Sequence, residues 1–324
     1  MDDTLRMKLD SGPSQFDLAR TEQMIVLRRA MRSAGLTVGA RYKGQFVLFV
    51  CALSYGGLAL AAELADHNIA WLAVWPIMSF LILSIAAGVH ETVHNHIFQR
   101  ATSRRAFQAL SSLLLLIPIG VYPAYHLSHH VYLDSAQDPE GVHRIRNRFE
   151  YLLGIFLSGP AFVGQLWWGG LRSWTPTPCQ YMRSGDHVRK ARADSLVAFA
   201  GLLVVSVGSF KSHTVFQVWL VPLALFLTVG IFFFLAPEHL DESNNSVAGL
   251  PASDAARTTT TNRFVRFVGM GFNYHGVHHA WPEVPGSQLG RADALFARLQ
   301  PDQWRSSGYL VWHLKAFRRL CWFR

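Results

Sequence analysis

The chain has 324 residues, of which 50% are hydrophobic and only 16% are charged. Because ordinary soluble domains carry about 25% charged residues, this composition excludes a typical soluble enzyme and favours an integral membrane protein of one domain. The three cysteines are odd in number and far apart, which argues against a disulfide framework or a cysteine metal site. The formal charge of +9 predicts basic cytoplasmic loops, with no nucleic acid as partner.

The N-terminal residues 1–43 mix charges of both signs, and we expect them to form a cytoplasmic tail. Two uncharged apolar stretches follow, 44–62 and 69–89, with a short polar turn between them. Each stretch has about the length that a transmembrane helix needs. The sequence therefore predicts a first transmembrane hairpin over 44–89.

A histidine cluster begins where the second predicted span ends. His90 and His94 are four residues apart, so they share one face if the helix continues out of the bilayer. The stretch reads His-Glu-Thr-Val-His, which is also the zinc metalloprotease pattern, with Glu91 as the general base.

A second cluster follows the apolar stretch 107–125, which contains the helix breaker Pro118. His126, His129 and His130 are spaced at i, i+3 and i+4, which places them on one face of a helix. Such a face can present all three imidazoles to one site.

A second transmembrane hairpin is predicted from 195–210 and 215–237, which are joined by residues 211–214. The apolar stretch 151–170 precedes it and is interrupted by Pro160. His239 follows the last span directly. The third cluster repeats the spacing of the second with His275, His278 and His279.

The three clusters can share one site only if they lie on the same side of the bilayer. The stretch 107–125 then cannot span, because it alone separates the first cluster from the second. The hairpin 195–237 supplies two crossings before the third cluster, so 151–170 is also expected to lie in the interface. We therefore expect an all-α fold of four transmembrane helices with interfacial helices and a histidine-rich cap. The membrane domain covers 44–300, and 301–324 forms a cytoplasmic C-terminal tail.

Charge gives an independent prediction of orientation. Of the 30 Lys and Arg residues, eight lie in 1–43, eleven in 95–194 and ten in 238–324, which leaves only Lys211 on the opposite side. Cytoplasmic loops carry the Lys and Arg excess. Both termini and the histidine clusters are therefore expected to face the cytoplasm.

Nine imidazoles are too many for one tetrahedral zinc ion, which takes about four ligands, and they suit two ions of higher coordination. Ligand type alone does not choose among iron, zinc, copper and nickel. The candidate metal ligands are His90, His94, His126, His129, His130, His239, His275, His278 and His279.

These motifs resemble those of the membrane fatty acid desaturase family. The resemblance covers about residues 44–300 and rests on three stretches. They are the histidines of 90–94, those of 126–130 with Asp138-Pro139-Glu140 after them, and Asn-Tyr-His-Gly-Val-His-His-Ala-Trp-Pro-Glu-Val-Pro at 273–285. His239 also resembles a family position that supplies an extra ligand.

The resemblance implies a cytoplasmic non-heme di-iron site, dioxygen as co-substrate, and oxidation of a C–H bond in a fatty acyl or lipid chain. It also implies an external electron donor, either ferredoxin, rubredoxin or a b-type cytochrome with its reductase. The absence of a targeting segment and of a fused donor domain leads us to expect a bacterial inner membrane.

Several residues keep two interpretations at this stage. Four carboxylates can orient ligand imidazoles or be solvated loop residues: Glu91, Asp138, Glu140 and Glu238. His96 can be a tenth ligand or a surface residue. Five histidines lack motif context and are predicted to be structural: His67, His143, His187, His213 and His313.

The sequence leaves three competing functions. A lipid or carotenoid hydroxylase or ketolase on the same di-iron fold has no distinguishing motif. A zinc membrane protease uses only His90, Glu91 and His94 and leaves seven histidines unexplained. A non-catalytic metal-binding membrane protein or transporter predicts charged residues in mid-span, and the predicted spans contain none.

Overall fold

A computed structural model describes residues 25–322, apart from 27, 40, 66–67, 134, 142–144, 241–255 and 298–304. Residues 1–24 of the predicted N-terminal tail, residues 301–304 of the predicted C-terminal tail, and the histidines His67 and His143 lie outside the described residues. Nearly all described elements are helices; the one sheet among them pairs β1 (Thr258–Thr259) with β2 (Arg305–Ser306) in parallel. The all-helical prediction is confirmed, with this two-stranded exception.

Two long antiparallel helices form the first hairpin, α3 (Arg41–Leu64) and α4 (Asn68–Val93). They contain the predicted spans 44–62 and 69–89. Helix α4 ends at Val93, so it carries His90 in its last turn and His94 follows its last residue directly. Asn95, two residues on, has a left-handed backbone with φ of 63°, a conformation that ends helices.

The stretch 107–125 is divided among three short elements and not one helix. Helix α5 (Ala101–Leu115) is followed by Leu116, whose φ of 59° is left-handed. The turn η1 (Ile119–Val121) then leads into α6 (Tyr122–Tyr132), which begins with a proline in its first turn. None of these elements reaches the length that crosses a bilayer.

The second hairpin is longer than its hydropathy predicts. Helix α8 (Gly185–Lys211) begins ten residues before the predicted span, because charged residues such as Arg189 hide its first turns from a hydropathy search. One residue later a continuous helix starts, made of α9 (His213–Val215), η2 (Phe216–Leu220), α10 (Val221–Leu225), η3 (Phe226–Gly230) and α11 (Ile231–His239). Its segments η2 and η3 are π-helical turns, which are frequent at functional sites.

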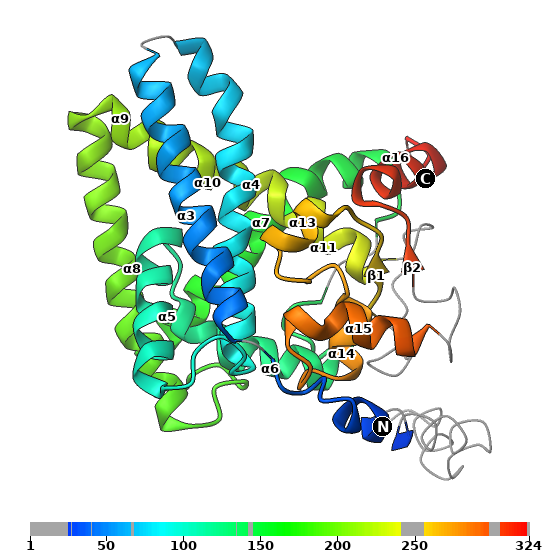
Figure 1. The fold of residues 1–324 in the computed structure, drawn as a ribbon. Helices are drawn as coiled ribbons and strands as arrows, with labels where there is room; N and C mark the ends of the chain where they lie inside the picture. Colours follow the sequence, from blue (N-terminus) through cyan, green and yellow to red (C-terminus); the bar gives the residue numbers. More distant parts are fainter. Residues whose placement is uncertain are drawn as a thin grey trace.

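Helix α7 (Arg148–Arg172) contains the stretch 151–170 and is the fifth helix long and apolar enough to cross a membrane. Length and composition alone therefore do not confirm the predicted count of four. At its start Arg148 donates to a carbonyl of α16 (Tyr309–Arg319), and at its end Gly170 packs against Ser195 of α8. Helix α7 thus connects the C-terminal helix to the second hairpin (Figure 1).

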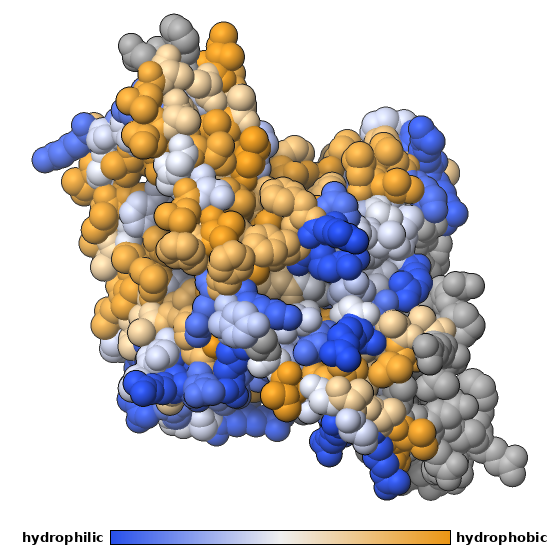
Figure 2. All heavy atoms as spheres, viewed as in Figure 1, coloured by the Kyte–Doolittle hydropathy of each residue, from blue (hydrophilic) through white to orange (hydrophobic). Residues whose placement is uncertain are grey.

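The remaining short helices complete the cap: α13 (Arg263–Val268), α14 (His275–Ala280) and α15 (Gly286–Phe296). They lie on one side of the long helices, together with α16 (Figure 1). Hydrophobic residues dominate the visible surface of α3 and α8, whereas hydrophilic residues gather at the lower end of the bundle (Figure 2). This division fits a membrane-embedded bundle that carries a polar cap.

Candidate metal centre

Four helical segments bring the predicted histidines together. His90 and His94 lie at the end of α4, and His239 is the last residue of α11. The other six come from α6 and α14, where the i, i+3, i+4 spacing turns three rings to one face of each helix. Seven of the nine residues are at most 8% exposed, and His94 and His130 are partly buried.

The nine histidines form two groups, in each of which one candidate ligand atom per residue lies within 4.8 Å of all the others. One group has five members: His90, His94, His126, His130 and His278. The other has four: His129, His239, His275 and His279. The structure therefore assembles every predicted ligand, and among the described residues it adds none to these groups.

The spacing of the ring nitrogens fits metal ions better than hydrogen bonds. The Nε2 atom of His275 lies 3.0 Å from Nε2 of both His239 and His279. A neutral ring nitrogen offers one proton or one lone pair, so it cannot satisfy two such neighbours. Two nitrogens bound at right angles to one ion, each about 2.1 Å from it, are roughly 3.0 Å apart.

Unpartnered buried nitrogens support the same interpretation. The Nε2 atoms of His90, His94 and His129 are buried and have no hydrogen-bond partner. Leaving a buried polar atom unpaired is costly, and a bound ion would remove that cost at all three positions. Five and four imidazoles are suitable ligand sets for two ions with open coordination positions.

Carboxylates lie behind the rings, at the Nδ1 atoms. Asp138 is 2.9 Å from Nδ1 of His129, and Glu140 is 3.4 Å from Nδ1 of His126. Two more contacts are longer: Glu91 to His90 at 3.7 Å and Glu238 to His275 at 3.9 Å. All four side chains are at most 10% exposed, so they are not solvated loop residues. Their position is that of groups that orient ligand rings.

Burial controls the protonation of the cap residues. It lowers the pKa of His94 to about 3 and that of His130 to about 2, with neighbouring histidines adding to the shift. Burial also lowers the pKa of His129, but the charge of Glu140 and the hydrogen bond with Asp138 outweigh it and raise that pKa. Burial raises the pKa of Glu140 to about 7. Neutral imidazoles are the form that binds metal.

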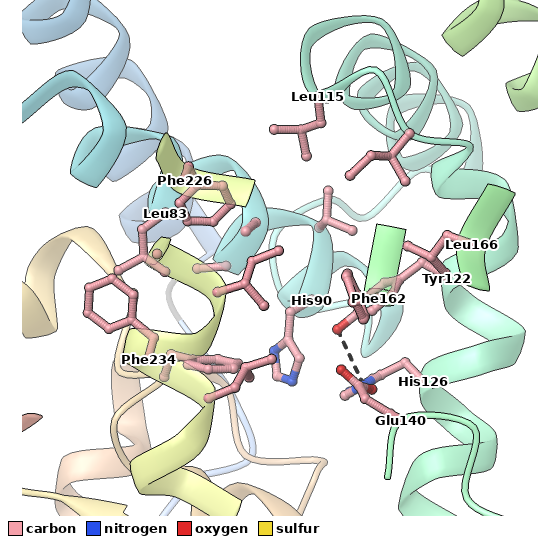
Figure 3. A pocket seen from close by; sticks show the side chains of 18 of the residues that line it. Leu83, His90, Leu115, Tyr122, His126, Glu140, Phe162, Leu166, Phe226 and Phe234 are labelled. Atoms are coloured by element: carbon pink, nitrogen blue, oxygen red, sulfur yellow. Dashed lines mark hydrogen bonds and ion pairs between the residues drawn. The ribbon is translucent and has the colours of Figure 1, made fainter. Parts of the chain in front are cut away.

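An apolar cavity of about 100 Å³ lies against both histidine groups (Figure 3). Its walls come from α4, η1, α6, α7 and the 213–239 helix, with side chains such as Leu83, Phe162 and Phe234. His90 and His126 face it from the five-membered group. A hydrocarbon segment placed there would lie beside the metal positions and away from water.

The remaining described histidines lie outside both groups. His96 contacts Glu91 at 3.3 Å through Nδ1 and belongs to neither group. His313 is held at both ring nitrogens, by the Tyr151 hydroxyl at 2.7 Å and by the Phe233 carbonyl at 2.9 Å. These contacts give His313 a packing role.

The protease pattern at 90–94 does not have protease geometry. Glu91 accepts the backbone N–H of Gly286 at 2.8 Å and lies beside Nδ1 of His90, behind the ring. A general base would instead face water on the Nε2 side, where the metal would bind. His90 and His94 also share their group with three histidines from other helices, which a two-histidine protease site does not explain.

One residue near the site has no sequence signal. Tyr309, at the start of α16, donates a hydrogen bond of 2.6 Å to Glu238. It lies in the predicted C-terminal tail, where only the amphipathic periodicity of 309–319 could have indicated a packed helix. The C-terminal segment therefore contributes to the support of the site.

A family model described as fatty acid desaturase matches residues 69–313, which include every histidine of both groups. No curated protein matches the chain.

Proposed function

The chain belongs to the fatty acid desaturase family, and we propose that it is a membrane-bound, non-heme di-iron oxidoreductase that introduces a double bond into a fatty acyl or lipid chain. The observation that supports this proposal most strongly is the pair of histidine groups, with five and four members, beside an apolar cavity. Dioxygen is the co-substrate in this proposal. The two irons are its cofactors.

Each part of the site has a role in this proposal. The nine imidazoles would hold the irons, which supply the oxidising power toward a methylene group that no side chain offers. Asp138 keeps His129 in the tautomer whose Nε2 is free for metal. Phe162 and Leu83 line the cavity and would align the acyl chain while excluding water.

The electrons come from outside the chain. Removal of two hydrogen atoms supplies two electrons, whereas reduction of dioxygen to water needs four, so two must be delivered by a donor. We propose a ferredoxin, rubredoxin or b-type cytochrome with its reductase. Such a donor would bind at the cap, because the cap helices α6 and α14 carry six of the nine histidines.

The proximity of the His129 and His239 rings supports a topology of four transmembrane helices. His129 and His239 have ring centroids 5.1 Å apart, so the chain between them crosses the membrane an even number of times. Helix α8 and the helix 213–239 supply two crossings, which leaves α7 in the interface. We propose that both termini and the cap are cytoplasmic, with the protein in a bacterial inner membrane.

Cellular lipid analysis tests the proposed reaction and its nearest alternative. Bacteria expressing the chain should accumulate an unsaturated acyl chain that is absent from cells expressing the His278→Ala variant. A hydroxylated or ketolated lipid or carotenoid as the sole new product would replace desaturation with hydroxylase or ketolase chemistry. No new product in cells that supply a competent electron donor would contradict the proposal.

A further inference from the structure

A second hollow lies next to the metal-site cavity. It is a groove of about 730 Å³ between α7 and α11, here called the α7–α11 groove. Helix α7 contributes Leu153, Leu157 and Ala161, and helix α11 contributes Phe232 and Leu235. Its walls are thus mainly hydrocarbon, and its volume exceeds that of the inner cavity severalfold.

Only a thin wall separates the groove from the metal-site cavity. Four residues line both spaces: Glu140, Phe162, Ile231 and Leu235. Glu140 is also the residue beside Nδ1 of His126. A chain lying in the groove would therefore need only side-chain movement to enter the cavity.

The groove is open toward an apolar exterior. Helix α7 exposes a stripe of large hydrophobic side chains along its length, including Phe149 at 53%, Phe156 at 57% and Trp168 at 60%. Leu157, which lines the groove, is 55% exposed. An exposed apolar surface of this extent indicates contact with lipid, so the groove faces the hydrocarbon of the bilayer.

One basic residue, Arg146, lines one end of the groove. Its side chain is 76% exposed and pairs with Glu150 at 2.8 Å. Arg148, on α7, does not line the groove, because its guanidinium donates to the carbonyls of Phe317 and Arg318 on α16. Guanidinium groups bind phosphate through paired hydrogen bonds, and basic residues at a membrane surface attract anionic lipids.

We propose that the α7–α11 groove is the lateral entry for an acyl chain of an anionic phospholipid, whose phosphate binds at Arg146 while the chain lies along α7. This inference rests on the proposed function and adds its substrate class, an intact membrane lipid. The acyl chain then reaches the histidine groups from within the bilayer, past Phe162.

Photocrosslinking tests the groove without requiring turnover. The purified full-length protein is placed in phosphatidylcholine vesicles that contain a phosphatidylglycerol with a diazirine in its acyl chain. After illumination, mass spectrometry locates the labelled peptides. We expect labels on α7 and α11, and Ala161→Trp should decrease labelling of α11 about tenfold, which corresponds to about 1.4 kcal/mol.

The matched control is Gly164→Trp. Gly164 is exposed on the same helix, has open space at its Cβ position and does not line the groove, so labelling of α11 should not change. Leu157→Trp gives a second groove variant if Ala161→Trp does not fold, as judged by its thermal unfolding. Equal labelling of α11 in the wild type and in a folded groove variant would overturn the proposal.

A second experiment tests whether the acyl chain comes from a soluble thioester instead of a membrane lipid. A photoreactive acyl thioester of coenzyme A is added from the water phase. Labelling of the groove by this thioester but not by phosphatidylglycerol would also overturn the proposal. Specific groove labelling in a chain that forms no unsaturated product would leave the lipid site intact and contradict the proposed reaction. An unsaturated product without groove labelling would contradict the lipid entry alone.

Discussion

The Nε2 atoms of His130 and His278 lie 3.1 Å apart, although 148 residues separate them in the chain. His130 belongs to α6 and His278 to α14, so this contact joins two cap helices that are remote in sequence. A metal ion bound by both nitrogens would cross-link the two helices. Metal binding at this centre should therefore contribute directly to the stability of the cap.

Changing His130→Ala should remove one ligand from the five-membered group. We expect the metal content to fall by about one ion per chain. Activity should fall by more than the 10- to 100-fold that is typical when a residue hydrogen-bonded to a metal ligand is lost. Elemental analysis and product analysis measure the two effects. His213→Ala is the control, because His213 is exposed and lies outside both groups; an equal loss in both variants would contradict the assignment of His130.

Asp138 should matter through the orientation of His129. Asp138→Ala removes the acceptor at 2.9 Å, and we expect metal affinity to fall about 10- to 100-fold, with a smaller loss for Asp138→Asn, which keeps an acceptor. A competition titration with a chelator measures the affinity. Asp186→Ala is the matched control, since Asp186 pairs with exposed cations on α8. Unchanged affinity in Asp138→Ala would contradict this role.

Tyr309→Phe tests the support from the C-terminal helix. The change leaves the buried carboxylate of Glu238 without its donor at 2.6 Å, so the free energy of unfolding should decrease by about 1–3 kcal/mol. Thermal unfolding in detergent measures the change. Tyr132→Phe removes a hydroxyl that only accepts from the exposed Arg183, and it should have little effect. Equal stability of the two variants would show that Tyr309 contributes no special support.

Cysteine labelling tests the position of α7. In a chain whose three native cysteines are replaced, single cysteines at Arg146 and Arg183 flank α7, and one at Lys211 lies at the tip of the second hairpin. A membrane-impermeant maleimide added to intact cells should label only the cysteine at Lys211. Labels at 146 and 183 from opposite sides of the membrane would mean that α7 crosses, and the four-span topology would be wrong.

Local spacing was sufficient to predict the ligand candidates. The i, i+3, i+4 spacing places three histidines on one face of α6 and of α14 however these helices pack. His239 was identifiable because it directly follows an apolar run. The division into five and four was not predictable, because it depends on how α6 and α14 meet. His129 and His130 are neighbours in sequence yet belong to different groups.

Hydropathy was less informative about helix limits and tertiary support. The charged first turns of α8 concealed ten helical residues, and α7 is long and apolar enough to span, although the topology proposed above places it in the interface. Tyr309 could not be found, since its hydrogen bond to Glu238 joins residues 71 positions apart. Contacts of this kind follow from the packing of whole helices, which no short pattern encodes.

Elemental analysis of the purified full-length protein, from cells grown with ample iron, tests the central claim most directly. The two histidine groups predict close to two irons per chain, and the double variant His130→Ala, His279→Ala should lose most of both. One zinc per chain and no iron would contradict the di-iron centre. That result would return attention to Glu91 and to hydrolytic chemistry at residues 90–94.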